Sequence, residues 1–332
     1  MEPAERARAF AAARLGAGRQ TPLAGDASTR SFWRWRRGRR RAVLMLFPAG
    51  DSKQLEATLA VHRLLIRAGL PVPRMLGKDA AAGVLAFQDL GDTTLQHWVR
   101  SHGAAAAEQW LERGRRLIHR IQALPAPRIR AALPACPELA PLRFRFELEF
   151  FRRHYLAGWL ERSVSRGNGA RLDHCFDDLC SELARQPRVF CHRDLMSRNL
   201  MICRNRLWML DFQDAQWGPY SYDLASLLFD SSSRQGVSGR AALTARFLGR
   251  WNRARQGPGR PRRAFELDLH RAGLQRNLKE LGTFAAQALV WGRKGYMRHV
   301  PRARRNIVGH LRRLSEGPEL ASLLHRLGVL DG

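Results

Sequence analysis

Residues 189–223 read VFCHRDLMSRNLMICRNRLWMLDFQDAQWGPYSYD, and this stretch decides the fold. It holds a His-Arg-Asp triplet ending at Asp194, then Asn199, then two short apolar runs at 200–202 and 207–210, and then Asp211. A polar turn at 203–206 separates the runs, which together predict a tight β-hairpin. Because a hairpin returns the chain to the edge where it began, we expect the side chains of Asp194, Asn199 and Asp211 to converge on one rim.

Three converging oxygen-bearing side chains suit the transfer of a phosphoryl group from a nucleotide. That reaction needs a carboxylate that orients the attacking hydroxyl and accepts its proton, and hard oxygen ligands that hold Mg²⁺ against the phosphates. We therefore predict Asp194 as the catalytic base, Asn199 and Asp211 as ligands of Mg²⁺, and a nucleotide as the phosphoryl donor. The alternative is an ordinary hairpin with surface acids, which the complete set of residues at this spacing disfavours.

The residues before this stretch predict a small α+β lobe over residues 1–91. A helix at 2–15, closed by Gly16, precedes two strands at 31–36 and 41–47 that a hairpin at 37–40 joins. Ser52 is a suitable N-cap for a helix that Gly69 ends, and two further strands follow, the second at 84–90. The order strand, strand, helix, strand, strand favours an antiparallel sheet with one main helix.

The rest of the chain, residues 92–332, predicts a larger and mostly helical lobe. Helical patterns cover 94–101, 105–124, 143–160 and 172–185, and a linker rich in Gly and Ser at 163–170 separates the last two. A short helix at 224–228 follows Asp223, and the C-terminal third is helical apart from an interruption at 255–261. We expect a bilobal α+β fold with a hinge at the end of the first lobe.

The residues quoted above resemble the protein-kinase-like superfamily, whose signature is His-Arg-Asp, four residues, Asn, and later Asp-Phe-Gly. Two departures exclude the protein-kinase branch. Gln213 and Asp214 stand where the glycine would be, and the 11 residues between Asp211 and Asp223 leave no room for an activation segment. The pattern is similar to the aminoglycoside-phosphotransferase branch, which phosphorylates hydroxyl groups of small molecules.

Within that branch the chain resembles the anomeric sugar kinases of bacterial cell-wall recycling. The resemblance rests on GDASTR at 25–30, FQDLG at 87–91, VFCHRD at 189–194, RNLM at 198–201, LDFQDA at 210–215, GPYSYD at 218–223 and LQRNLK at 274–279. It implies ATP-dependent phosphorylation of the anomeric hydroxyl of N-acetylmuramate and/or N-acetylglucosamine. The product would be the sugar 1-phosphate.

The resemblance also implies two nucleotide-binding segments. The loop of Gly25, Asp26, Ala27 and Ser28, between the first two strands, would cover the phosphates with its backbone amides. Its alternative is a plain hairpin turn. The hinge of Gln88, Asp89 and Leu90 would recognise adenine through backbone groups, and its alternative is a bare interlobe linker.

One part expected of a kinase is missing, namely the lysine on the third strand that holds the nucleotide phosphates. The strand reads VLMLF at 43–47, and Met45 occupies the corresponding position. We expect another cation to replace the lysine, either Arg30 or Arg198, of which Arg198 is the better placed in sequence because it directly precedes a metal ligand. The alternative for Arg198 is a surface arginine.

The sugar site has the fewest signals. Arg276 or Lys279 would pair with the lactyl carboxylate of a muramic sugar, or both would belong to a solvated helix face. Asp223 would support the catalytic loop by accepting hydrogen bonds from its backbone. Asp214 either acts behind the metal ligands or caps a turn.

The formal net charge of +28 raises the question of nucleic-acid binding. Of the 57 basic residues only four are lysine, and the arginines are spread over the whole chain, which is typical of a GC-rich genome. We expect no specific nucleic-acid partner, but a surface that attracts anions and repels polycations such as aminoglycosides.

Localisation and assembly follow from simpler features. No apolar run is long enough for a membrane span, and we expect no signal peptide and five reduced cysteine thiols. We expect a cytoplasmic monomer acting on a small sugar. Two alternatives remain open: a kinase of another small alcohol, such as a different sugar or an amino alcohol, and a non-catalytic nucleotide- or RNA-binding regulator.

Overall fold

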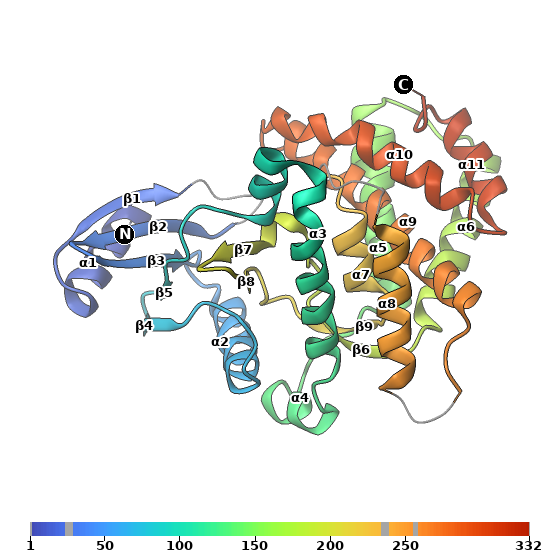
Figure 1. The fold of residues 1–332 in the computed structure, drawn as a ribbon. Coiled ribbons are helices and arrows are strands. Elements are labelled where there is room, and N and C mark those ends of the chain that lie inside the picture. The colour runs from blue at the N-terminus through green and yellow to red at the C-terminus, as the bar shows by residue number, and fades with distance from the viewer. Residues whose placement is uncertain (1, 24–28, 234–238, 255–257, 332) are drawn as a thin grey trace. The chain divides into compact units, whose positions relative to one another are not determined.

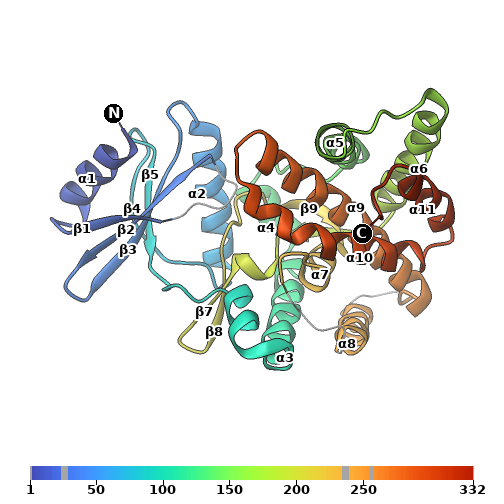
Figure 2. The ribbon, with the colours of Figure 1, turned by 90° about the horizontal axis from the view of Figure 1, so that it is seen from above.

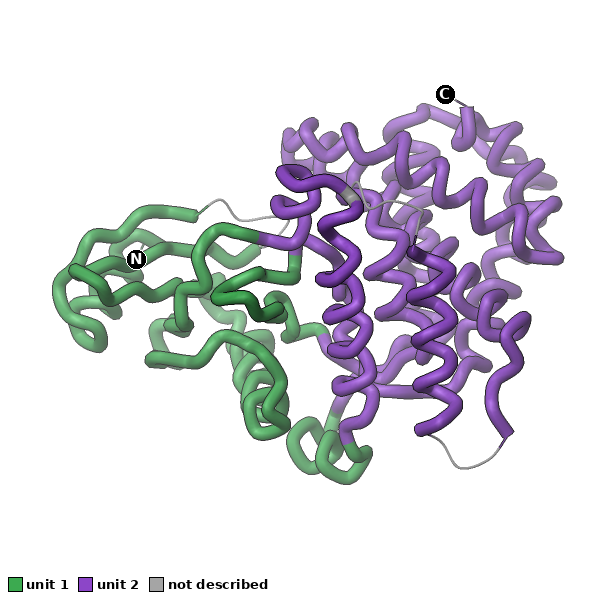
Figure 3. The backbone as a smooth tube through the Cα atoms, in the orientation of Figure 1, with its two compact units in different colours: residues 1–93, 125–135, 199–214 green, residues 94–124, 136–198, 215–332 purple. Residues whose placement is uncertain are grey.

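Contacts divide the chain into two compact units (Figure 3). The computed structural model describes residues 2–23, 29–233, 239–254 and 258–331. Unit 1 comprises residues 1–93, 125–135 and 199–214, and unit 2 comprises residues 94–124, 136–198 and 215–332. The chain therefore passes between the units several times, and the hairpin that follows Asn199 belongs to unit 1.

A five-stranded antiparallel sheet forms the centre of unit 1. Its order is β1-β2-β3-β5-β4, with β1 at Arg19–Leu23, β2 at Ser31–Arg37, β3 at Arg40–Leu46, β4 at Met75–Asp79 and β5 at Val84–Gln88. The sheet confirms the predicted small α+β lobe and adds one strand, β1, to the four expected. Pro22 lies in β1, and an edge strand is where a sheet tolerates proline because the ring lacks an N–H.

Two helices cover opposite faces of this sheet (Figure 2). Because alternate side chains of a strand point to opposite faces, Val84 and Ala86 of β5 pack with α1 (Pro3–Arg14), whereas Leu85 and Phe87 pack with α2 (Ser52–Arg67). The same alternation in β3 places Met45 on the face of α2. This alternation sets the direction of the Met45 side chain, which stands where a kinase is expected to carry its lysine.

The predicted cap of α2 was wrong by one residue. Asp51, not Ser52, is the N-cap, and its carboxylate accepts a hydrogen bond from the amide of Gln54 at 3.3 Å. A further short helix, α4 (Ala126–Ala132), packs against α2 in unit 1 and interrupts the proline-rich stretch in which no helix was expected.

The hairpin of β7 (Leu200–Cys203) and β8 (Arg206–Met209) completes unit 1 and lies within one residue of the predicted limits. Two backbone hydrogen bonds attach it to the rest of unit 1, from Ile202 N to Thr93 O and from Met209 N to Pro71 O, each 2.8 Å long. The hairpin is thus held at both strands by segments that flank the sheet.

Unit 2 is organised around α9 (Arg262–Leu289), which is buried along most of its length (Figure 1). The helices that pack against α9 are α5 (Pro141–Phe151), α6 (Arg166–Ala184), α7 (Tyr222–Leu228), α8 (Arg240–Arg253) and α10 (Val300–Leu311), with the π-helix at Arg152–Trp159 and the 3₁₀ helix at Lys294–His299. Gly282 allows the backbone of α5 to approach α9 closely, since a Cβ there would lie 2.7 Å from the Cα of Phe151. The predicted helical lobe is confirmed.

The remaining elements of unit 2 differ from expectation in two places. The expected linker at 163–170 is shorter, because Ser165 caps α6 and the helix begins at Arg166. The predicted break between residues 101 and 105 appears as a kink at Gly103 (φ 80°) inside α3 (Leu95–Gln122). A ribbon of β6 (Arg188–Cys191) and β9 (Gln216–Pro219) and the C-terminal α11 (Gly317–Arg326) complete the unit.

All five cysteines are free thiols, as the sequence predicted. Among the described residues, no helix combines the length and the apolar character needed to cross a bilayer.

Candidate active site

The catalytic loop begins directly after β6, and its backbone is fixed by one buried carboxylate. Asp223, the second residue of α7, accepts hydrogen bonds from the amides of His192 and Arg193, both at 2.8 Å. Its side chain thereby supports Arg193 in a left-handed backbone conformation (φ 76°), which a non-glycine residue rarely adopts. The predicted support of the loop by Asp223 is confirmed.

A second carboxylate, which sequence reasoning missed, fixes the end of the loop. Asp230 is buried and follows α7, and its Oδ2 accepts hydrogen bonds from the amide of Ser197, at 2.9 Å, and from the Ser197 hydroxyl. One acid in the first turn of a seven-residue helix and a second acid just after the helix therefore hold both ends of the loop. The only signal in the sequence was an aspartate at the end of an apolar helix, next to three serines.

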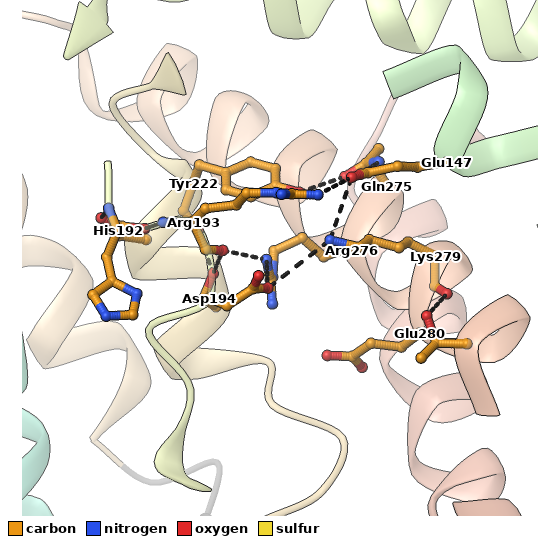
Figure 4. Close-up of polar contacts among 12 residues, drawn as sticks. Glu147, His192, Arg193, Asp194, Tyr222, Gln275, Arg276, Lys279 and Glu280 are labelled. Atoms are coloured by element: carbon orange, nitrogen blue, oxygen red, sulfur yellow. Dashed lines mark hydrogen bonds and ion pairs between the residues drawn. The ribbon is translucent and has the colours of Figure 1, made fainter. Parts of the chain in front are cut away.

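The side chain of Arg193 is anchored away from the loop. Its guanidinium donates to Glu147 Oε1 at 2.7 Å, and Gln275 Nε2 donates to Glu147 Oε2 at 2.8 Å (Figure 4). Burial alone would raise the pKa of Glu147, but Lys279 and Arg193 outweigh it and lower this pKa to about 2. Glu147 is thus an ionised, buried counter-ion for the cations around the loop, and nothing in its sequence context on α5 indicated this role.

Asp194 lies in a strongly cationic environment. Arg276 NH1 is 3.5 Å and Lys279 Nζ is 3.9 Å from its Oδ1, both from α9 (Figure 4). Burial opposes ionisation, yet Lys279, Arg276 and Arg193 hold the pKa of Asp194 well below its usual range. A quarter of the side chain is exposed (25%), so an ionised and oriented carboxylate is presented at the surface of unit 2.

Neither of the two expected sugar-binding cations lies on a solvated helix face. The Arg276 side chain is 3% exposed, and its NH1 donates to the carbonyl of Arg193 at 2.7 Å, so it braces the catalytic loop. Lys279 is 20% exposed and lies between Glu147 and Asp194. Both cations therefore surround the catalytic loop itself.

In unit 1, the hairpin brings Asn199 and Asp211 to the same end. The amide of Leu210 donates to the carbonyl of Asn199 at 2.9 Å, which places Asp211 one residue beyond the pair. Asp211 has a left-handed backbone (φ 59°) and a side chain that is 41% exposed. That Asp194 meets these two groups at one metal ion stays a prediction.

The donor set of this end fits Mg²⁺. Within the described parts of the chain, no cluster of three or more His, Cys, Asp or Glu side chains is arranged for a metal ion. Mg²⁺ bound with a nucleotide needs fewer protein ligands, because phosphate oxygens and water complete its shell. Oδ1 of Asp211 accepts from Arg30 and Gln213, whereas Oδ2 accepts from no described residue and is available as a ligand.

Gln213 occupies the position of the missing glycine and links the two acids around it. Its Nε2 donates to Asp211 Oδ1 at 2.9 Å and to Asp214 Oδ2 at 3.0 Å. Gln213 thus connects Asp214 to Asp211, and a role of Asp214 behind the predicted metal ligands stays a prediction.

Arg30 reaches the place that the missing lysine leaves. Its guanidinium donates to Asp211 Oδ1 at 2.8 Å and lies 3.9 Å from the sulfur of Met45, and its side chain is only 6% exposed. Arg198, the other candidate, is half-buried in the 3₁₀ turn Ser197–Asn199. The structure therefore places Arg30 beside both Met45 and Asp211.

The hinge residues are fixed by an arginine of β2. Arg34 Nε lies 2.9 Å from Asp89 Oδ2, and its NH2 donates to the Gly91 carbonyl at 3.0 Å. The Asp89 side chain is therefore buried in an ion pair, whereas the amide of Leu90 has no hydrogen-bond partner among the described residues. Such an amide is available to a ligand, as the prediction of backbone recognition requires. The other predicted nucleotide-binding loop, Gly25, Asp26, Ala27 and Ser28, lies outside the described residues.

Comparison with solved structures supports the fold. The chain is similar to a choline/ethanolamine kinase family protein from Mesorhizobium loti, with a TM-score of 0.62, 17% identity and 99% of both chains covered. It is also similar to an ADP-bound aminoglycoside phosphotransferase, with a TM-score of 0.63, 12% identity and coverage of 95% of this chain and 99% of that one. At these identities the likeness concerns the fold alone.

Comparison with curated sequences is closer. An N-acetylmuramate/N-acetylglucosamine kinase from Pseudomonas aeruginosa is 34% identical over 92% of this chain and 88% of that protein. A kinase of the same name from Neisseria meningitidis is 31% identical over 94% of this chain and 90% of that protein. A family model described as the phosphotransferase enzyme family matches residues 19–291. This match covers most of the chain, including the catalytic loop and the hairpin, and the chain therefore belongs to the phosphotransferase enzyme family.

Proposed function

We propose that this protein transfers the γ-phosphoryl group of ATP to the anomeric hydroxyl of N-acetylmuramate or N-acetylglucosamine. The substrate class rests on the relatives of the same name, which match nearly the whole chain. The chemistry rests on one observation: Asp194 is ionised, partly exposed and held in place by a frame of buried hydrogen bonds. The protein would act as a cytoplasmic monomer, without a nucleic-acid partner, in the recycling of cell-wall sugars.

Asp194 orients the sugar hydroxyl and receives its proton while the phosphorus–oxygen bond to the sugar forms and the bond to ADP breaks. A carboxylate with so low a pKa is a weak base, so proton transfer would come late in the reaction. This agrees with the loose transition state of phosphoryl transfer, in which the attacking oxygen gains little charge early. The principal contribution of Asp194 would therefore be alignment.

Asn199 and Asp211 would hold Mg²⁺, which shields the charge of the phosphates when bound. Arg30 would add a second positive charge beside Asp211. Residues 1–91 would form the nucleotide-binding lobe, with the amide of Leu90 donating to adenine, and residues 92–332 would carry the catalytic loop and the sugar site.

A panel of acceptors tests the proposal. ADP release is measured with N-acetylmuramate, N-acetylglucosamine, glucosamine and choline, and we expect turnover with the two acetylated sugars. Turnover with choline alone would favour the alternative, a kinase of an amino alcohol, and would reject the sugar assignment.

The role of Asp194 is tested by D194N, which keeps the shape of the side chain and removes its charge. We expect kcat to fall by about 10²- to 10⁴-fold, the usual contribution of a positioned proton acceptor. D178N, which changes an exposed carboxylate of α6, is the matched control and should retain full activity. Undiminished turnover by D194N would disprove the mechanism.

A further inference from the structure

Lysine is rare in this protein, which makes its one half-buried lysine informative. The 57 basic residues include four lysines. Lys53, Lys78 and Lys294 are exposed, whereas Lys279 lies on α9 beside the catalytic loop. Arginine is the usual cation of this chain, and it is also the better partner for a fixed, two-pronged ion pair. A lysine beside Asp194 therefore suggests a need for a compact, single-point cation.

The contacts of Lys279 leave its donors available. Nζ lies 3.4 Å from Glu147 Oε1 and 3.9 Å from Asp194 Oδ1, both longer than the roughly 2.8 Å of a charge-assisted hydrogen bond. Both oxygens of Glu147 already accept hydrogen bonds from Arg193 and Gln275, so Lys279 contributes charge to Glu147 and no hydrogen bond of normal geometry. Within the described residues, the ammonium group makes ion pairs but donates no hydrogen bond of normal geometry.

Two carboxylates oppose the effect of burial on this ammonium group. Burial lowers the pKa of Lys279, and the carboxylates of Asp194 and Glu147 oppose that shift. Arg276 performs a different task, since its NH1 is engaged with the Arg193 carbonyl. Lys279 Nζ, by contrast, donates no hydrogen bond of normal geometry to a described residue.

The position of Asp194 limits what Lys279 can touch. If Asp194 receives the hydroxyl proton, the attacking oxygen lies about 3 Å from its carboxylate, and the phosphorus lies about 3 Å beyond that oxygen. Nζ, at 3.9 Å from Oδ1, is therefore within reach of the oxygens of the transferring phosphoryl group. The lactyl carboxylate of a muramic sugar is carried two ring carbons away from the anomeric carbon, and so lies farther from the reacting atoms.

We propose that Lys279 is a catalytic residue that donates to an oxygen of the transferring phosphoryl group and stabilises the negative charge on it in the transition state. This proposal rests on the proposed role of Asp194. It assigns Lys279 to the phosphoryl group, which is common to all acceptors, instead of to the carboxylate that only N-acetylmuramate carries. Glu147 is its positioning partner.

The test replaces Lys279 by methionine, which keeps the length of the side chain and removes its charge. K279M should lower kcat by about 100-fold with both N-acetylmuramate and N-acetylglucosamine, by the same factor, and leave both sugar KM values within about threefold. K53M, which changes an exposed lysine of α2, is the control and should behave as the parent protein.

A second pair of measurements separates catalysis from structural support. K279A should regain turnover in proportion to added methylammonium, which a purely structural role of Lys279 would not produce. Thermal unfolding shows whether K279M is folded. If it is not, K279Q replaces it in the kinetic test, because glutamine keeps a polar group near Glu147.

Three outcomes would overturn the proposal: a kcat of K279M or K279Q within about threefold of the parent with both sugars, a KM that rises for N-acetylmuramate alone, or no rescue of K279A by methylammonium. ATP hydrolysis measured without sugar keeps this test independent of the sugar assignment. K279M should lower that hydrolysis as well. If the parent hydrolyses ATP but phosphorylates neither sugar, the proposed function fails while the effect of K279M on hydrolysis still decides the role of Lys279.

Discussion

At the scale of single residues, two aspartates of the candidate site are presented by strained backbone. Arg193, just before Asp194, and Asp211 itself both have positive φ angles, of 76° and 59°. A non-glycine residue in this region costs on the order of 1 kcal/mol, and it persists only where surrounding contacts hold it. Asp223 holds the first with two backbone hydrogen bonds, and Arg30 and Gln213 bind the side chain of the second.

Also at the scale of single residues, substitutions distinguish the two cations proposed to replace the missing lysine. Arg30 lies against Met45 and donates to Asp211, so we expect R30A to lower kcat/KM by about 100-fold, the usual effect of removing one donor aimed at developing charge. R198A should lose as much only if Arg198 shares this role. R36A, which changes an exposed arginine of the same strand as Arg34, is the control.

Steady-state kinetics and ATP affinity report both effects. A change of less than about threefold in R30A would remove Arg30 from the mechanism, and the same limit applies to Arg198. Loss of ATP affinity without loss of kcat would instead indicate that Arg30 binds the nucleotide equally well in the ground state and the transition state.

At the scale of elements, α9 connects the candidate site to the rest of unit 2. Its middle turns carry Gln275, Arg276 and Lys279 toward the catalytic loop, while Asn277, on another side of the helix, faces α10. A helix that is buried all round can present different groups on every side, because its neighbours supply a partner for each. The orientation of α9 thus decides which of its polar residues face the chemistry.

A buried histidine pair joins α9 to α10. His270 Nδ1 lies 2.9 Å from His310 Nδ1, and His310 Nε2 lies 3.1 Å from Asn277 Oδ1. The amide nitrogen of Asn277 donates to the Phe229 carbonyl, so its oxygen must accept, His310 donates through Nε2, and His270 donates through Nδ1. Burial, together with Arg313, Glu266 and Arg240, sets the pKa of His270 at about 4, and burial also lowers that of His310.

These shifts predict acid sensitivity. Both histidines are neutral when folded and titrate near 6.5 when unfolded, so the unfolded state binds more protons below that pH. The contribution of the neutral histidines to the free energy of unfolding is complete above about pH 6.5 and is lost as the pH falls toward 4. At pH 5, His270 alone lowers the free energy of unfolding by on the order of 2 kcal/mol.

Urea unfolding at pH 7.5 and pH 5 measures this loss. H270N retains a donor near Nδ1 without the titration, and it should lose less stability between the two pH values than the parent protein. H174N, which changes an exposed histidine of α6, should follow the parent. An equal loss in H270N and the parent would contradict the assignment.

At the scale of the whole molecule, the charge of +28 has a consequence of its own. An arginine-rich surface binds polyanions by releasing their counterions, so we expect RNA binding without sequence preference that weakens by about 10³-fold or more between roughly 50 and 200 mM salt. Fluorescence anisotropy with two unrelated RNA sequences checks this. A preference for one sequence that survives at the higher salt would support the nucleic-acid alternative.

Much of the fold follows from local signals. The strands 31–36 and 41–47 and the hairpin after Asn199 were predicted within a residue or two, because apolar alternation and turn residues act over short distances. The edge strand β1 was missed in the count since it is short, polar and contains Pro22. The cap at Asp51 was missed because Ser52 is an equally good cap by type.

The sequence by itself determined which chemical groups are available. It places His-Arg-Asp, Asn and Asp at a spacing that one hairpin can bridge, and it lacks the lysine expected on the third strand of the sheet. Only the tertiary structure decided which distant residues act on these groups. Glu147 and Lys279 lie on α5 and α9, and Asp230 follows α7. Their roles depend on how these helices pack, which no local pattern records. The physical reason is that a polar contact across 30 or more residues is set by the packing of the elements that carry it, whereas a turn or a strand is set by its neighbours in sequence.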